Sequence, residues 1–148
     1  MDGADAERRT LKELSDRQAL RDLAARYARI PDDRDYGAVD EVFTRDARLL
    51  GPGFHLEGRE QIREAMRSIE RYRATQHTMH QQSVALRGDE AEGEVYCVAH
   101  HLHEVDGRPQ KLDWGIRYRD RYRREPEGWR LARRELVIVW TQQLPLES

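Results

Sequence analysis

The chain lacks several features that mark common classes of protein. A single cysteine, Cys97, excludes an internal disulfide and a cysteine-based zinc cluster. The longest unbroken apolar run, Leu136–Trp140, is far shorter than the ~20 residues that cross a bilayer. The first residues show no basic segment followed by an apolar one, which is what a secretory signal requires. We therefore expect a cytoplasmic protein without membrane association.

Lysine is also scarce, and the net charge is small. Lys12 and Lys111 are the only lysines among 26 basic residues, against 28 acidic ones, for a formal charge of −2. Arginine suits contact with phosphate, but arginine-rich stretches such as Arg117–Glu125 also carry acids. No positive field follows that would attract a polyanion, so we expect no nucleic-acid partner.

The periodicity of the apolar residues first predicts helices. Residues 1–10 are polar and are expected to fray, which leaves 11–148 as one domain among the 148 residues. Ser15 and Gln18 form a capping-box pattern at the start of the first helix. That helix is expected to end near Arg29, because Pro31 disfavours the α conformation of the residue before it. A short helix after Asp35 and another over about 59–71 complete the set.

Strand-like segments make up the rest. A short hairpin is expected over 47–50 and 54–57, and four longer strands follow at 76–87, 91–105, 111–124 and 129–141. Tight turns between the long strands require an antiparallel meander. We predict an α+β conical barrel, in which a curved antiparallel sheet is covered on its concave face by three N-terminal helices.

Alternation along two of these strands predicts which side chains face the helices. On the strand at 91–105 the inward set is Ala91, Gly93, Val95, Cys97, Ala99, His101 and His103. On the next strand it is Trp114, Ile116, Tyr118, Asp120 and Tyr122. A carboxylate such as Asp120 is costly on an apolar face unless it has a partner. A strict two-residue turn at Gly88-Asp89 would pair His77 with His100, so whether His100 or His101 faces the cavity stays open.

Several local motifs carry a resemblance that spans about residues 15–140. They are Ala19–Tyr27, Asp32–Tyr36, Val42–Ala47, Glu57–Ile62, Thr75–His77, Gly88–Ala91, Asp120–Tyr122 and Gly128-Trp129. Together they resemble the nuclear-transport-factor-2-like superfamily, and most closely its SnoaL-like branch, which includes polyketide cyclases, scytalone dehydratase and bile-acid 7α-dehydratase. The resemblance implies a deep apolar pocket for a small molecule and a homo-oligomer, either a dimer or a trimer.

The same resemblance assigns roles to individual residues. In dehydratase-like members a tyrosine of the first helix and an aspartate just after it approach a histidine that opens the third strand. These roles fall on Tyr27, Asp32 and His77, and His101 matches a second pocket imidazole. Substrate contacts are expected from Tyr118, Asp120, Trp114 and Cys97. The late-strand arginine of the bile-acid enzyme falls in Leu136–Trp140, where this chain has none, which argues against that substrate.

An aspartate bonded to one imidazole nitrogen makes the other nitrogen a better base. Such a pair can remove a proton beside a carbonyl and then protonate a departing hydroxyl, while Tyr27 polarises the carbonyl oxygen. This chemistry predicts a cofactor-independent dehydratase, isomerase or cyclase that acts on a small, cyclic, largely apolar carbonyl or hydroxyl compound. No third ligand joins His101 and His103, so we expect neither metal nor cofactor.

Other interpretations of these residues remain. Asp32 could cap a helix, His77 could be satisfied by backbone, and Tyr27 could be core. The chain would then be a non-catalytic small-molecule-binding module or an accessory protein similar to an oxygenase small subunit. The segment Leu136–Trp140, apolar on both faces, predicts a subunit contact on its outer side.

Overall fold

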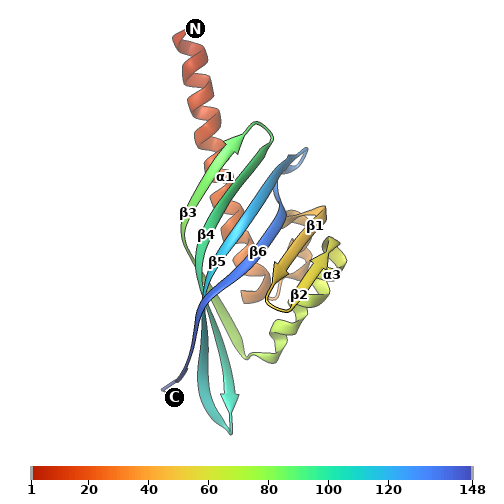
Figure 1. The fold of residues 1–148 in the computed structure, drawn as a ribbon, viewed down its shortest axis with the longest axis vertical. Coiled ribbons are helices and arrows are strands. Elements are labelled where there is room, and N and C mark those ends of the chain that lie inside the picture. The colour runs from red at the N-terminus through yellow and green to blue at the C-terminus, as the bar shows by residue number, and fades with distance from the viewer. Residues whose placement is uncertain (1, 148) are drawn as a thin grey trace.

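The computed structural model describes residues 2–147, which form a helical N-terminal part and a six-stranded curved sheet (Figure 1). The helices are α1 (Gly3–Asp32), α2 (Val39–Val42) and α3 (Gly58–Met66), with 3-10 helices η1 (Tyr36–Ala38) and η2 (Arg67–Arg71). The strands are β1 (Phe43–Gly51), β2 (Phe54–Glu57), β3 (Ala74–Arg87), β4 (Glu90–Val105), β5 (Arg108–Glu125) and β6 (Gly128–Pro145). Among the described residues, no helix has the length and apolarity needed to span a membrane.

Helix α1 begins well before the predicted capping box. It starts at Gly3, and the side chain of Asp2 caps it by accepting a backbone N–H of the first turn. Ser15 therefore lies in the middle of the helix with an exposed side chain, and the prediction that the helix starts there is wrong. Residues 3–10, which were expected to fray, are helical, and their side chains are exposed.

The other end of α1 also differs from the prediction, because the helix continues past Arg29 and through Pro31 to Asp32. Proline removes a single backbone hydrogen bond at this position. The last turn is closed by the Asp33 N–H, which donates to the Arg29 carbonyl at 2.9 Å. Pro31 is buried against the rest of the protein. This extra turn carries Asp32 to the start of β3.

The sheet has the strand order β2-β1-β6-β5-β4-β3. The four long strands form the predicted antiparallel meander, and β1 and β2 form the predicted hairpin. The prediction of a wholly antiparallel sheet is wrong in one pair, because β1 runs parallel to β6. The sheet is not closed, since β2 and β3 remain its edges. The α+β fold with helices packed against a curved sheet is confirmed, and the helix expected over 59–71 is divided into α3 and η2.

A bulge in β3 sets the register of the inner face. Met79 pairs with Cys97 and Gln82 with Val95, so that two residues of β3 lie opposite one residue of β4. The shift pairs His77 with Ala99, whereas a strict turn would have paired it with His100. The side chains of β4 predicted to face inward are buried or half-buried, as the alternation indicated.

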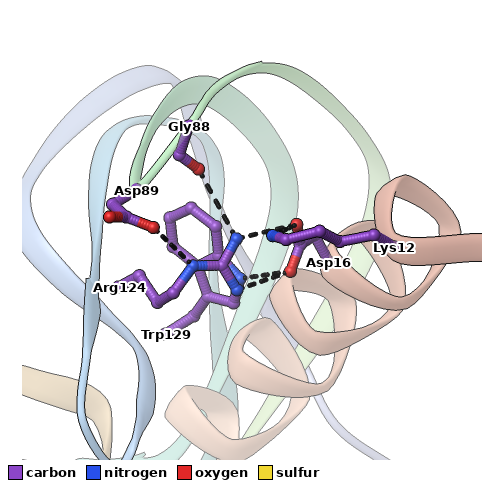
Figure 2. A network of polar contacts seen from close by, with 6 residues as sticks. All are labelled: Lys12, Asp16, Gly88, Asp89, Arg124 and Trp129. Atoms are coloured by element: carbon purple, nitrogen blue, oxygen red, sulfur yellow. Dashed lines mark hydrogen bonds and ion pairs between the residues drawn. The ribbon is translucent and has the colours of Figure 1, made fainter. Parts of the chain in front are cut away.

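A network of polar contacts joins α1 to the ends of β5 and β6 (Figure 2). Arg124 of β5 donates from both terminal nitrogens to the Asp16 carboxylate, at 2.7 and 2.8 Å. The indole of Trp129 donates to the same carboxylate at 3.1 Å, and the Arg124 guanidinium lies 4.4 Å from the centre of its ring. Lys12 and Asp89 complete the network at its exposed sides.

These contacts make the stability of the protein depend on pH through Asp16. The hydrogen bonds from Arg124 hold the pKa of this carboxylate well below its ordinary value. A carboxylate whose pKa is lowered by folding stabilises the protein fully above its unfolded pKa of ~3.9, and this contribution is lost as the pH falls below that value.

We therefore expect Asp16→Asn to lower the free energy of unfolding by about 1–3 kcal/mol at pH 7. The difference from wild type shrinks below about pH 4. Urea unfolding at a series of pH values measures it. Asp89→Asn is the matched control, since Asp89 bonds the same arginine but its side chain is 80% exposed, and it should change little. A deficit of Asp16→Asn that is constant from pH 7 to pH 3 would contradict the assignment.

Candidate active site

The predicted aspartate and histidine are in direct contact. Asp32, at the end of α1, and His77, near the start of β3, lie 2.8 Å apart between Oδ1 and the ring Nδ1. The second carboxylate oxygen accepts the backbone N–H of His77 at 2.8 Å, and Thr75 donates its hydroxyl to Oδ1 at 2.8 Å. The Asp32 carboxylate therefore bonds the ring of His77, the backbone N–H of the same residue and the hydroxyl of Thr75. These contacts together fix the orientation of the His77 ring.

The protonation of this pair follows from its contacts. Burial by itself raises the pKa of Asp32, but the hydrogen bonds from the His77 ring, from its backbone N–H and from Thr75 outweigh burial and lower the pKa. Asp32 is therefore an ionised acceptor, and Nδ1 of His77 carries the proton. The other ring nitrogen, Nε2, takes no part in the contact with Asp32 and is available to a molecule in the adjoining cavity, which His77 lines.

His101 of β4 is the second imidazole of this face, which settles the alternative between His100 and His101. Its ring lies 6.1 Å from that of His77, centre to centre, and is only 2% exposed. Nδ1 donates to the Leu112 carbonyl at 2.9 Å. Burial lowers the pKa of His101, which favours the neutral ring with Nε2 as an acceptor. His100 lies on the outer face of the sheet, where it bonds Asp113 at 2.6 Å.

Tyr27 and Tyr118 lie together at the inner end of the site, with ring centres 5.5 Å apart. Both are buried, and burial raises the pKa of each phenol, so both stay protonated donors near neutral pH. Arg134 of β6 packs against both rings, with its guanidinium carbon 4.2 Å from the ring centre of Tyr27 and 4.1 Å from that of Tyr118. Arg134 thus sets the positions of both tyrosines through cation–π contacts.

Arg134 is a residue that sequence analysis missed. It is fully buried and pairs with Asp120 through two hydrogen bonds of 2.8 and 2.7 Å. Tyr122 donates to the same carboxylate at 2.6 Å, so the carboxylate on the apolar face has its partners. The resemblance placed a late-strand arginine in Leu136–Trp140, and the structure has one just before that segment. Arg134 is engaged by Asp120, so the expectation against the substrate of the bile-acid enzyme is unchanged.

A cavity of about 580 Å³ opens from these residues toward the β1–β2 hairpin and α3. Apart from Tyr27, His77, His101, Tyr118 and Trp114, its lining is mostly apolar and includes Pro31, Leu49, Phe54, Leu56, Met66, Ile69, Ile116, Leu136 and Ile138. Asp120 and Cys97 are not among the lining residues. Asp120 is engaged by Arg134, and burial raises the pKa of the Cys97 thiol to about 11. The structure therefore brings together five of the expected site residues around one cavity, with Asp32 behind His77.

Comparison with known proteins adds the family. A family model described as a SnoaL-like domain matches residues 12–135. The chain belongs to the SnoaL-like family. An uncharacterized protein from Mycobacterium tuberculosis is 32% identical over 131 residues, which cover 84% of this chain and 86% of the relative.

Solved structures of similar fold include two that bear on lyase chemistry. A candidate scytalone dehydratase from Novosphingobium aromaticivorans has a TM-score of 0.82 at 20% identity, with 94% of each chain covered. A hexachlorocyclohexane dehydrochlorinase, LinA type 2, has a TM-score of 0.81 at 20% identity, with 93% of each chain covered. At this identity the likeness shows the SnoaL-like fold alone.

The side chains around the cavity of this SnoaL-like chain are suited to proton transfer. They present an oriented imidazole, a second neutral imidazole and protonated phenols on one apolar cavity. Within residues 2–147, His, Cys, Asp and Glu side chains nowhere gather in threes that could hold a metal ion. Asp32 and His77 are in contact beside this cavity, which is the arrangement that an acid–base pair requires.

Proposed function

We propose that the protein is a cofactor-independent lyase of the dehydratase type, which acts on a small, cyclic, largely apolar carbonyl or hydroxyl compound. One observation carries the proposal: the Asp32–His77 pair, joined at 2.8 Å, borders an apolar cavity of about 580 Å³. A cavity of this size accommodates a small cyclic molecule. The family and its lyase-type structural neighbours agree with this class of reaction.

The reaction begins at Nε2 of His77. This nitrogen takes the proton from the carbon beside the substrate carbonyl, and Asp32 stabilises the imidazolium that forms. The electron pair of the broken C–H bond forms the new double bond, and the carbon–oxygen bond of the hydroxyl breaks. The imidazolium returns its proton to the departing hydroxyl, which leaves as water. The protein ends in its starting state.

Two further residues support these steps. The hydroxyl of Tyr27, kept protonated by burial, donates to the carbonyl oxygen as negative charge develops there. Neutral His101 presents Nε2 to the same cavity as an acceptor for a substrate hydroxyl. An isomerase or cyclase would use the same proton transfers, with the proton returned to carbon.

A binding module without chemistry is less well supported. Binding alone does not require an imidazole whose orientation is set by a carboxylate, yet Asp32 accepts three hydrogen bonds from His77 and Thr75 at Oδ1 and Oδ2.

A contact with another subunit is supported by one observation, because the apolar residues Val139 and Trp140 of β6 are 60% and 44% exposed. We propose that this surface joins copies of the chain into a homo-oligomer. Light scattering that finds only monomer would contradict this assembly.

Proton transfer can be tested before the natural substrate is known. The wild-type protein, dialysed against EDTA, is incubated in D2O with cyclic ketones and cyclic β-hydroxy ketones, and NMR follows deuterium uptake beside the carbonyl and loss of water. We expect deuterium uptake or dehydration faster than the buffer rate for at least one compound, with no loss of rate after dialysis. Buffer rates for the whole panel, or activity that EDTA abolishes, would reject the proposal.

A further inference from the structure

Arg71, the last residue of η2, gives the cavity a charge that the proposed proton transfer does not use. We propose that the substrate carries an anionic group, a carboxylate in the simplest case, and that Arg71 binds it. This inference rests on the proposed function in that the same cavity holds the substrate. It narrows the substrate class from a largely apolar ring compound to an organic acid with one apolar ring system.

The charge of Arg71 has no counterion among the residues that the structure describes. It is the sole arginine, lysine, aspartate or glutamate among the lining residues that the structure describes. No carboxylate of residues 2–147 lies within ion-pair distance of it. The adjacent acid, Glu70, accepts a hydrogen bond from the Tyr36 hydroxyl at 3.0 Å. An unpaired guanidinium beside an apolar cavity favours an anion there.

The Arg71 side chain is exposed and makes two contacts with Tyr72. Its guanidinium carbon lies 4.9 Å from the ring centre of Tyr72, and Nη2 donates to the Tyr72 hydroxyl at 3.2 Å. Tyr72 is itself buried, and its ring lies 4.7 Å from that of His101. These contacts favour a position of the guanidinium beside the Tyr72 ring, and its remaining N–H groups match the two oxygens of a carboxylate.

The arrangement of charges orients such a substrate. Asp32 is ionised and lies behind His77, so it repels an anion that approaches the base. Arg71 packs on the Tyr72 ring, which contacts the His101 ring, and the His101 ring in turn lies 6.1 Å from that of His77, so two rings stand between Arg71 and the base in this series of contacts. A substrate with its acid group at Arg71 therefore presents its other end, which is uncharged, to Nε2 of His77.

Two probes of the same shape test the inference by binding alone. They are 2-naphthoate and 2-naphthamide, rigid apolar bicycles that differ in charge, and isothermal titration calorimetry measures the Kd of each. We expect wild type to bind the carboxylate about tenfold more tightly than the amide. Arg71→Gln should remove this preference without changing the Kd of the amide, and added salt should weaken it in wild type.

Arg67→Gln is the matched control, because Arg67 belongs to the same 3-10 helix but packs over Tyr36 and pairs with Glu64. It should keep the preference. Equal affinity of wild type for the two probes, no binding of the carboxylate, or a preference that survives in Arg71→Gln would overturn the inference. If wild type has no activity but His77→Ala still prefers the carboxylate probe to the amide, the proposed lyase function is rejected and the anion site at Arg71 is retained.

Discussion

His77→Ala is expected to lower the rate of proton transfer by at least about 10³-fold, the scale of losing a general base together with its oriented partner. Alanine removes the nitrogen that accepts the proton and leaves the Asp32 carboxylate without its ring contact. His77→Gln separates these effects, because its amide can still donate to Asp32 but cannot act as a base. Both variants should lose the rate, measured by deuterium uptake, while only alanine lowers the melting temperature noticeably.

The chain supplies its own control for this experiment. His100 lies on the same sheet, bonds an aspartate in the same way at 2.6 Å, and faces outward. His100→Ala should therefore leave the rate within about twofold of wild type. A full rate in His77→Gln, or an equal loss in His100→Ala, would show that the Asp32–His77 pair is not the catalyst.

Asp120→Asn is expected to lower the free energy of unfolding by about 3–5 kcal/mol, the cost of leaving a buried charge without its partner. Both Asp120 and Arg134 have side chains with no exposed surface. The variant would leave the guanidinium, which packs against two tyrosine rings, without an anion, and one of its terminal nitrogens, Nη1, already has no hydrogen-bond partner. Urea unfolding at pH 7 measures the loss.

Two further variants make this result specific to the buried pair. Asp46→Asn breaks an ion pair of the same length, 2.7 Å, but the Asp46 side chain is 72% exposed, so it should change stability little. Asp120→Asn combined with Arg134→Met removes both charges and should recover part of the loss. If Asp120→Asn is as stable as wild type, the pair does not stabilise the fold in the way its burial indicates.

The inner faces of β4 and β5 could be predicted from the sequence because alternation is a property of the extended backbone. The register between strands could not, since it depends on bulges. One bulge in β3 decides that His101 shares a face with His77. Another in β6 brings Arg134 opposite Asp120, where a strict turn would have brought the residue before it.

The sequence contains a partial signal for Arg134, the buried arginine that the sequence analysis missed. Asp120 on an apolar face required a partner, and the next strand offers two adjacent arginines, Arg133 and Arg134. Only the register distinguishes the buried one, Arg134, from its half-exposed neighbour. The end of α1 was missed for a similar reason, because Pro31 argues against a helix locally while contacts made by Asp32 with β3 stabilise the last turn.

One continuous helix, α1, carries two carboxylates that are engaged at different points along its length. Asp16 is tethered to the strand ends by Arg124, and Asp32 lies about 24 Å farther along α1 at the usual rise per residue. A helix resists stretching and twisting along its length, so the tethered end limits how far the other can slide or turn. The position of Asp32 beside His77 therefore depends in part on a contact made far from the cavity, and loss of the Asp16–Arg124 pair should weaken the Asp32–His77 contact without changing the cavity lining.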